Sequence, residues 1–177
     1  LSYPDNRGKR WAIHAAVTEL VTDHEFIVTV DSDTALEPNA IIDLVRPLKT
    51  AHIGATTGEV RLLNEHKNAL TKMTASYYWA ALNMQRKAQS ALGMVACCSG
   101  ALAAYKTSLL KSIIDDFVNE TFLGRECTYS DDRHLTNLVL RKRYDVRYIG
   151  TSVAYTRTPE TYRGFIRQQL RWRRGFY

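Results

Sequence analysis

The sequence predicts an α/β fold, with a Rossmann-like, mixed and mainly parallel sheet flanked by helices. Short apolar runs that end in acidic or small residues alternate with segments of helical period, the pattern of strands and covering helices. The chain has 177 residues, 45% of them hydrophobic, which suffices for one core, so we expect a single domain over 1–177. No complete βαβ unit precedes the first apolar run, and we therefore expect the fold to be incomplete at the N-terminus.

The net charge of the chain limits the classes of binding partner but does not select one of them. Lysine and arginine number 24 against 18 acidic residues, a net charge of +6, which suits an anionic ligand, an anionic membrane surface or nucleic acid. The three cysteines have neither disulfide nor metal-ligand spacing, which favours a reducing cytosolic setting. No apolar run approaches the roughly 18 residues of a membrane span, so any anchors would lie outside this chain.

The first expected element is a helix opened by Gly8 and Lys9. A helix N-terminus and a lysine ammonium can together hold a phosphate. The Gly-x-x-x-x-Gly-Lys spacing of a P-loop is absent. A solvated basic helix start explains the same residues. The sequence therefore supports Lys9 as a phosphate ligand only in combination with the acidic residues downstream.

The strand that organises the prediction runs from Phe26 to Asp33 and ends in Asp31 and Asp33. Ligands of parallel sheets lie beyond the carboxyl ends of buried strands, which would put both carboxylates at the mouth of a site. Two carboxylates repel unless they share a cation, and Mg²⁺ or Mn²⁺ would bridge them to the phosphates of a nucleoside diphosphate. The alternative is that Asp31 is a turn residue and Asp33 a helix cap.

The middle of the chain is expected to supply the body of the domain. We expect a covering helix after Pro38, a strand or hairpin arm over 53–63, and a long helix over 67–89. The broad apolar face of the long helix comprises Leu70, Met73, Tyr77, Ala80, Ala81 and Met84. We interpret this stripe as core, because apolar stripes at helical spacing usually face the interior.

A second apolar strand is expected over 94–101, ending in Ser99 and Gly100. Small side chains let a ligand or a backbone approach, and Gly100 would supply a conformation closed to other residues. Tight core packing explains these residues equally well. A helix is expected from Thr107.

A second acidic pair, Asp131 and Asp132, opens another expected helix. Acidic residues are favoured at a helix N-terminus, so capping is the plainer interpretation. Two adjacent carboxylates beside Arg133 and His134 exceed what a cap requires, and a carboxylate held in a cleft can deprotonate a sugar hydroxyl. Asp132 is our candidate general base, and we expect Asp131 to point elsewhere from the same helix start.

The last element, 159–177, is predicted to be a basic amphipathic helix at an interface, either a membrane surface or a partner. Gln168, Arg171 and Trp172 are spaced to share one face. An arginine neutralises a pyrophosphate, an amide hydrogen-bonds it, and an indole stacks on a sugar ring. Taken alone, the basic face is better explained as solvated surface.

Four stretches in this order resemble the processive family-2 glycosyltransferases. They are Asp31-Ser32-Asp33, Cys98-Ser99-Gly100, the segment from Ser130 to Asn137, and Gln168-Gln169-Leu170-Arg171-Trp172. The likeness covers nearly the whole chain and is greatest to hyaluronan synthases and to chitin and chitin-oligosaccharide synthases. Each motif is weak alone, and the combination is specific.

The resemblance implies the GT-A glycosyltransferase fold and inverting, processive transfer of N-acetylglucosamine, alternating with glucuronate in a hyaluronan synthase, from a UDP-sugar to a growing polysaccharide. It also implies an integral plasma-membrane protein with a cytoplasmic catalytic domain beside the membrane lipid surface. The implied site assigns the Mg²⁺ or Mn²⁺ ion and UDP to Asp33 and Asp31, the base to Asp132, and substrate contacts to Lys9, Ser99, Gly100, Gln168, Arg171 and Trp172.

Two departures from the family pattern affect this expectation. Ser130 stands where the family usually has glycine, which would alter the turn before Asp132 but leave its carboxylate in place. The uridine-binding strand and the transmembrane helices that the family carries are absent, so the chain looks like an internal fragment.

Three other functions compete with this interpretation. A chitin or chitin-oligosaccharide synthase remains the alternative, because no residue separates use of UDP-N-acetylglucosamine alone from alternation with UDP-glucuronate. A basic nucleic-acid-binding module would explain the charge but not the grouping of Gln168, Arg171 and Trp172 on one helix, so we expect no nucleic-acid partner. A phosphatase-like Mg²⁺ enzyme would use Asp31 and Asp33 but would leave that group without a role.

Overall fold

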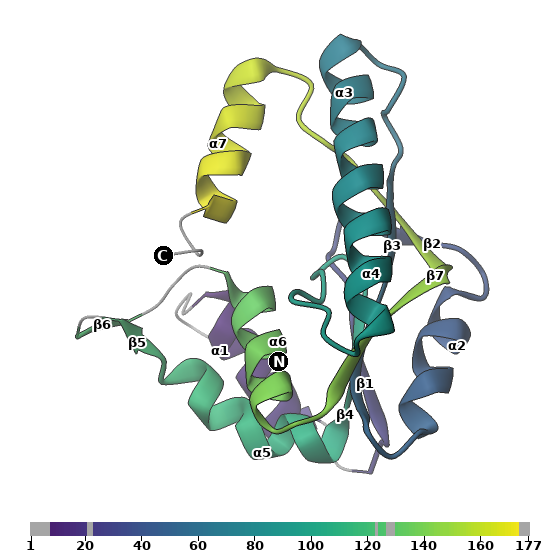
Figure 1. The fold of residues 1–177 in the computed structure, drawn as a ribbon. Coiled ribbons are helices and arrows are strands. Elements are labelled where there is room, and N and C mark those ends of the chain that lie inside the picture. Colours follow the sequence, from purple (N-terminus) through teal and green to yellow (C-terminus); the bar gives the residue numbers. More distant parts are fainter. Residues whose placement is uncertain (1–7, 21–22, 123, 127–129, 174–177) are drawn as a thin grey trace.

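A five-stranded sheet covered by helices forms the body of the computed structural model, which describes residues 8–20, 23–122, 124–126 and 130–173 (Figure 1). The strands are β1 (Phe26–Thr29), β2 (Ala35–Leu36), β3 (Ile53–Leu62), β4 (Ala103–Lys106), β5 (Thr121–Phe122), β6 (Arg125–Glu126) and β7 (Asp145–Thr156). The α-helices are α1 (Lys9–Ala15), α2 (Ala40–Val45), α3 (Ala69–Tyr78), α4 (Gln85–Ala91), α5 (Thr107–Val118), α6 (Asp131–Arg141) and α7 (Tyr162–Arg173). Short π-helical or 3₁₀ segments continue three of them, η1 (Ala16–Leu20), η2 (Arg46–Lys49) and η3 (Trp79–Met84).

The sheet has the order β1-β4-β3-β7-β2, and β5 pairs with β6 in a separate hairpin. The mixed α/β sheet is as predicted, but it is less parallel than expected. Among the described strands of the large sheet only β3 and β7 pair in parallel. The reason is a reversal before β4: Leu102 N–H donates to the Ser99 carbonyl at 3.0 Å, and the chain then runs back between β1 and β3.

Two apolar cores hold the helices against opposite faces of the sheet. On one face α5 and α6 pack on β3, β4 and β7, and this core includes Val95, Leu110, Phe117, Val139 and Val146. On the other face α2 and η2 pack on the same strands, and this core includes Leu44, Leu48, Leu102, Ala104 and Ala154. Strand β3 is buried along its length except at Arg61, because both of its faces are covered.

The expected strand over 94–101 is wrong. This segment makes only an isolated bridge, from Met94 to Val146, and the strand that follows begins at Ala103. Side chains take the backbone N–H groups that a sheet would use: Cys98 N–H donates to Thr136 Oγ1 at 2.8 Å and Ser99 N–H to Thr57 Oγ1 at 3.1 Å. A buried backbone donor needs a partner, and here the partners are hydroxyls instead of a neighbouring strand.

The strand that leads to the first acidic pair is shorter and less buried than expected. β1 ends at Thr29, is half-buried, and lies at the edge of the described sheet with β4 as its antiparallel partner. A turn follows, in which Thr34 N–H donates to the Asp31 carbonyl at 3.0 Å. The acidic residues therefore lie beyond the end of an edge strand, in a turn.

The long helix is present over 69–91, as α3, η3 and α4 in succession, and the capping box of Asn68 and Thr71 opens it. The interpretation of its apolar stripe as core is wrong, because Met73, Tyr77 and Met84 are exposed. The side turned to the interior carries Leu70, Thr71, Thr74, Tyr78, Asn83 and Arg86. Polar side chains can occupy this side because several find partners there, for example Asn83 with Glu59.

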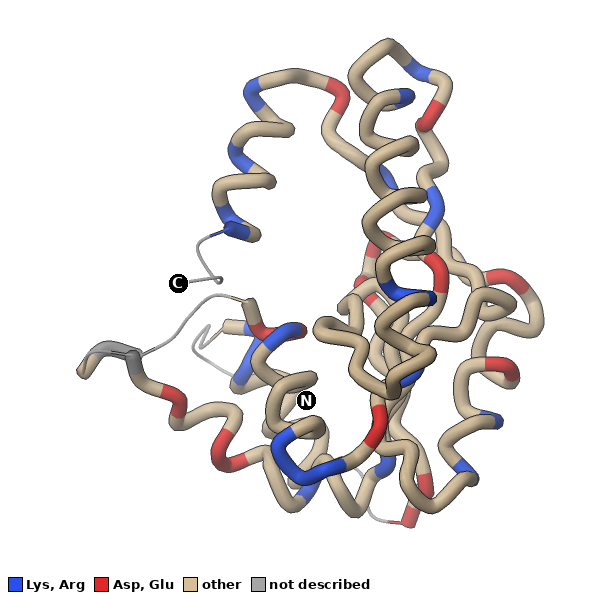
Figure 2. The backbone as a smooth tube through the Cα atoms, viewed as in Figure 1, with Lys and Arg blue, Asp and Glu red and all other residues tan. Residues whose placement is uncertain are grey.

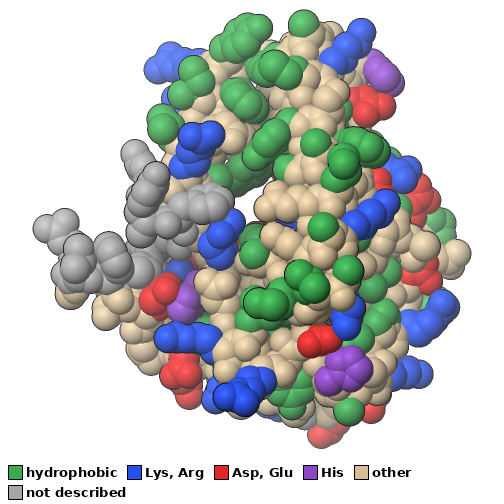
Figure 3. Space-filling view, viewed as in Figure 1, with side chains coloured by type: hydrophobic (Ala, Val, Ile, Leu, Met, Phe, Trp, Pro, Cys, Tyr) green, Lys and Arg blue, Asp and Glu red, His purple; other side chains and the backbone are tan. Residues whose placement is uncertain are grey.

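Helix α7 stands beside α3 and has no buried residue (Figure 1). Arg163, Arg167, Arg171 and Arg173 follow one another along it (Figure 2), and residues 174–177 of the predicted 159–177 helix lie outside the described chain. Exposed hydrophobic side chains gather over α3 and α7 in Figure 3. Within the described residues, no helix combines the length and apolarity needed to cross a membrane.

Candidate active site

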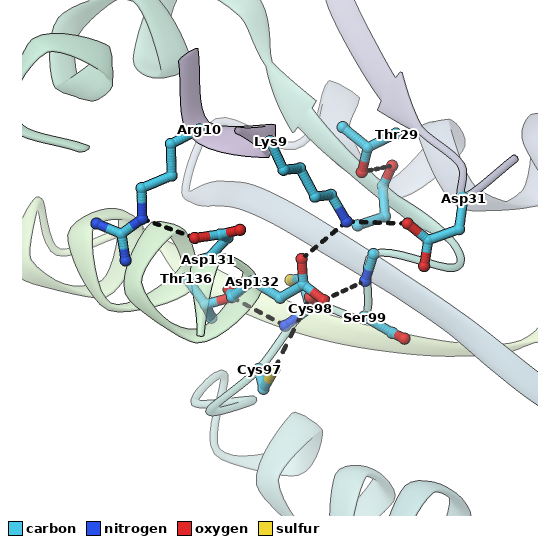
Figure 4. A network of polar contacts seen from close by, with 12 residues as sticks. Lys9, Arg10, Thr29, Asp31, Cys97, Cys98, Ser99, Asp131, Asp132 and Thr136 are labelled. Carbon is cyan, nitrogen blue, oxygen red and sulfur yellow. Dashed lines mark hydrogen bonds and ion pairs between the residues drawn. The ribbon is translucent and has the colours of Figure 1, made fainter. Parts of the chain in front are cut away.

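Three charged side chains from distant parts of the chain meet where α1 and α6 begin (Figure 4). Lys9 Nζ lies 2.9 Å from Asp31 Oδ1 and 3.7 Å from Asp132 Oδ1. Burial lowers the pKa of Lys9, but the carboxylates of Asp132 and Asp31 outweigh it, and the net pKa is raised. The ammonium is therefore fixed as a cation between the two acidic residues that the sequence singled out separately.

Asp132 is held on both of its carboxylate oxygens. Oδ1 faces Lys9, and Oδ2 accepts a hydrogen bond of 2.7 Å from Gly100 N–H. Desolvation raises the pKa of Asp132 above its ordinary value, against the opposing effects of Lys9 and Gly100. A partly exposed carboxylate with a raised pKa and a fixed orientation has the properties of a general base.

Gly100 is required here for space. A Cβ at this position would lie 2.7 Å from Lys9 Nζ and 2.9 Å from both Asp132 oxygens. Its backbone φ is outside the left-handed region, so the expectation of a conformation closed to other residues is wrong. The small side chain lets the backbone reach the carboxylate.

Ser99 and its neighbours form the scaffold under Asp132. Thr136 Oγ1 receives the Cys98 N–H and itself donates to the Asp132 carbonyl at 2.6 Å. Ser99 N–H is held by Thr57, whose hydroxyl donates to the Leu102 carbonyl at 3.0 Å. Thr136 thereby ties this segment to the start of α6, and Thr57 ties it to β3. Sequence reasoning missed both threonines.

A second charged network lies directly behind the first, and the sequence analysis missed its centre, Arg10. Arg10 Nε donates to Asp131 Oδ1 at 2.6 Å, and Nη1 donates to Glu120 Oε2 at 2.8 Å. The guanidinium also lies over the Phe117 ring, 5.2 Å from its centroid. Asp131 does point away from Asp132, as expected. The doublet Lys9-Arg10 facing the doublet Asp131-Asp132 was the signal that could have revealed this network.

The start of α6 contains the departure from the family pattern. Ser130 has φ 58° and ψ 45°, a left-handed conformation that favours glycine. The serine adopts the glycine geometry, and Asp132 remains directed at Gly100. The serine therefore strains the backbone locally and does not change the direction of the turn toward Asp132.

The predicted metal ligands, Asp31 and Asp33, lie on the turn after β1, with Asp33 exposed. Asp31 Oδ1 is engaged by Lys9. No group of three or more His, Cys, Asp or Glu side chains gathers as a metal site within the described ranges. The two hard carboxylates fit a Mg²⁺ or Mn²⁺ ion that takes its remaining ligands from phosphate oxygens and water, the usual arrangement for Mg²⁺.

The remaining predicted site residues lie on α7, and none of them forms a hydrogen bond or an ion pair with Lys9 or Asp132 within the described chain. Trp172 meets Tyr78 of α3, with ring centroids 6.2 Å apart and planes at 43°. Gln168 Oε1 is buried without a hydrogen-bond partner in the described chain. Burial raises the pKa of Tyr78, while Arg171 and Arg86 oppose this. The C-terminal half of α7 is thus joined to α3 through Trp172.

Comparison with known proteins assigns the family. A model of the glycosyltransferase-like family 2 matches residues 2–175 of this chain. The chain belongs to the family-2 glycosyltransferases. Hyaluronan synthase 2 of Xenopus laevis and hyaluronan synthase 3 of Homo sapiens are each 36% identical to it over 171 residues, which is 96% of this chain and 31% of the relative. The chain therefore spans about a third of the length of these relatives.

Solved structures agree on the fold of this family-2 glycosyltransferase. The mannosyltransferase PcManGT of Pyrobaculum calidifontis, in complex with GDP-Man and Mn²⁺, has a TM-score of 0.66 at 21% identity, over 97% of this chain and 42% of its own. Glucosyl-3-phosphoglycerate synthase of Mycobacterium tuberculosis, with Mn²⁺ and UDP-glucose, has a TM-score of 0.53 at 16% identity, over 98% of this chain and 54% of its own. The fold is the GT-A glycosyltransferase fold, as predicted.

Proposed function

We propose that the protein is an inverting, processive glycosyltransferase that extends a polysaccharide from UDP-sugars, as a hyaluronan synthase would. The observation that carries the proposal is Asp132: its carboxylate has a raised pKa and is fixed by Gly100 N–H beside Lys9. The identity to hyaluronan synthases over 96% of the chain supports the choice of polymer.

In the proposed reaction, Asp132 removes the proton from the acceptor hydroxyl as its oxygen attacks the anomeric carbon of the donor sugar. The attack comes from the face opposite the UDP leaving group, so one displacement inverts the anomeric centre. Lys9 approaches the diphosphate and stabilises its charge. Its hydrogen bond to Asp31 holds the ammonium beside the carboxylate that is proposed to bind the metal ion.

Asp33 and Asp31 would hold a Mg²⁺ or Mn²⁺ ion, which supplies charge neutralisation to the leaving diphosphate when bound. The solved neighbours named above bind Mn²⁺ with nucleotide sugars, which supports this choice of cofactor. Asp33→Asn in the full-length protein should sharply weaken Mn²⁺-dependent UDP binding measured by calorimetry. Asp43→Asn, which changes an acidic residue of α2, is the matched control.

Helix α7 is proposed to serve both substrates and the membrane. Arg171 and Gln168 would contact the diphosphate, Ser99 and Gly100 would line the sugar site, and Trp172 would support the acceptor ring. The exposed apolar side chains of α3 and α7, next to the arginines of α7, suit a membrane lipid surface, and with it a plasma-membrane protein whose catalytic domain is cytoplasmic.

The decisive experiment expresses the full-length protein in membranes and identifies the polymer formed from each UDP-sugar. Hyaluronan formed only when UDP-N-acetylglucosamine and UDP-glucuronate are both present supports the proposal. A polymer formed from UDP-N-acetylglucosamine alone would favour the chitin or chitin-oligosaccharide synthase. No polymer from any UDP-sugar would contradict both.

A further inference from the structure

Arg86 on α4 is a buried cation without a counter-ion in the described part of the chain. It is 7% exposed, and its Nη1 is buried without a hydrogen-bond partner. None of the described carboxylates lies within ion-pair distance of it. A buried guanidinium is costly unless it is paired, so its position calls for an anion that binds there.

The carboxylates that share its surroundings are already engaged. Asp132 accepts from Gly100 and faces Lys9. Glu59 pairs with Arg61 at 2.8 Å and accepts from Asn83 at 3.3 Å. The missing negative charge therefore does not come from these two acidic residues.

Arg86 lies on the buried side of α4, one turn before Gln89, whose Oε1 accepts a hydrogen bond of 3.2 Å from Ala96 N–H next to Cys97. Its positive charge opposes the rise in the pKa of Tyr78, whose ring centroid lies 6.2 Å from that of Trp172. Burial raises the pKa of the Cys97 thiol, and both Arg86 and Asp132 act on it from their own positions. The Cys97 thiol is thus within electrostatic range of both the unpaired cation and the candidate base.

We infer that Arg86 recognises the carboxylate of a uronic acid at the acceptor end of the growing chain. The inference rests on the proposed function, in which Trp172 supports the acceptor ring and Asp132 meets its hydroxyl. A hexuronate placed this way could direct its carboxylate to Arg86, where a guanidinium can bind it with two parallel hydrogen bonds. A neutral hexose would leave the buried cation unpaired, so Arg86 determines acceptor specificity.

The test separates the two half-reactions of the full-length protein in membranes. N-acetylglucosamine is transferred from its UDP-sugar to an oligosaccharide ending in glucuronate, and to the same oligosaccharide with that carboxyl reduced to the alcohol. Glucuronate is transferred from its UDP-sugar to an oligosaccharide ending in N-acetylglucosamine. The wild type should prefer the glucuronate end over its reduced form by about 10- to 100-fold in kcat/KM, the size expected for a charged hydrogen bond.

Arg86→Gln should lose most of that preference and retain the transfer of glucuronate. Arg86→Lys should keep part of the preference, because it keeps the charge without the planar fork. Lys87→Gln removes the exposed neighbouring cation and should change neither half-reaction. The comparison of the two acceptors in the wild type needs no variant, so it remains decisive if Arg86 variants fail to fold.

Three results would overturn the inference. One is a wild type that accepts both ends equally, and another is an Arg86→Gln protein that keeps the preference. The third is equal loss of all three transfers in folded Arg86→Gln and Arg86→Lys, which would give Arg86 a structural role. A wild type that transfers neither sugar overturns the proposed function itself, whereas one that polymerises N-acetylglucosamine alone leaves a glycosyltransferase and removes the role of Arg86.

Discussion

Two neighbouring ion pairs, Lys9 with Asp132 and Arg10 with Asp131, differ in burial and in the distance between their charged atoms, although their members are adjacent in sequence. The Lys9 and Asp132 side chains are 45% and 38% exposed, and their charged atoms are 3.7 Å apart. The Arg10 and Asp131 side chains are 8% and 18% exposed, and their charged atoms are 2.6 Å apart. The helices α1 and α6 thus meet through two ion pairs. We call the buried pair, Arg10 with Asp131, the closed pair, and the more exposed pair, Lys9 with Asp132, the open pair.

The difference shows how this site separates anchoring from chemistry. Arg10 is fixed by Asp131, by Glu120 and by the Phe117 ring, so it has little freedom to meet a substrate. His134 adds to this anchor through Glu120 Oε1 at 2.7 Å, and burial lowers the pKa of His134. Lys9 and Asp132 remain accessible, and the closed pair next to them sets the direction from which they reach the site.

The largest effect on stability is expected from breaking the closed pair. Arg10→Met leaves Asp131 and Glu120 without their shared cation, and removal of one partner from a buried pair costs about 3 kcal/mol or more. The thermal midpoint of the full-length protein should fall clearly. Lys9→Met removes the exposed neighbour and should cost about 1 kcal/mol or less. Equal losses in the two variants would contradict the contrast between the pairs.

The largest effect on rate is expected from the open pair. Asp132→Asn should reduce sugar transfer by about 10²-fold or more, because the amide cannot accept the acceptor proton. UDP-sugar binding, measured by calorimetry, should stay nearly unchanged, and the thermal midpoint should not fall. Asp131→Asn is the matched control and should lose stability before it loses rate. Parallel loss of binding and transfer in Asp132→Asn would make this residue a structural cap.

A smaller effect concerns the pH dependence of transfer. Asp132 works as a base only when deprotonated, and the positive charge of Lys9 lowers the pKa of Asp132 against the effect of burial. Lys9→Met should therefore raise that pKa and move the acidic limb of the kcat/KM profile to higher pH. Profiles of the wild type and of Lys87→Met should coincide. A limb that stays in place in Lys9→Met would show that another group sets it.

The smallest effect is expected at the turn that orients both acidic residues. Ser130→Gly keeps the left-handed conformation and removes its steric cost, about 1–2 kcal/mol for a non-glycine residue. The extra chain entropy of glycine in the unfolded state offsets part of this gain. The net gain in unfolding free energy should be about 1 kcal/mol or less, with transfer maintained. Arg143→Gly, at the other non-glycine residue of the described chain with a positive φ, is the control. A loss of transfer in Ser130→Gly alone would show that the serine itself serves the site.

The sequence predicted the main candidate residues of the site, but not the residues that position or surround them. The Asp-x-Asp turn, the acidic start of α6 and the Gln-x-x-Arg-Trp segment on α7 could each be found by their chemistry and spacing. Arg10, Thr57 and Thr136 could not, because each matters through contacts with residues far away in sequence, and Arg86 could not, because its burial is decided by the packing of the helix. The roles of the predicted residues, from Lys9 to Trp172, stay predictions that the experiments above address.

The sequence by itself determined the α/β class, the helices over 69–91 and from Thr107 and Asp131, and the strand over 53–62, because helical period and β-branched runs are local properties. Only the tertiary structure decided that 94–101 is no strand and that the Met and aromatic stripe of α3 faces outward. Those outcomes depend on which side chains reach a backbone donor and on which helix face finds polar partners. The tertiary structure likewise decided that adjacent charges at 9–10 and 131–132 divide into an open and a closed pair, since burial is a property of the packed helices and not of the residue types.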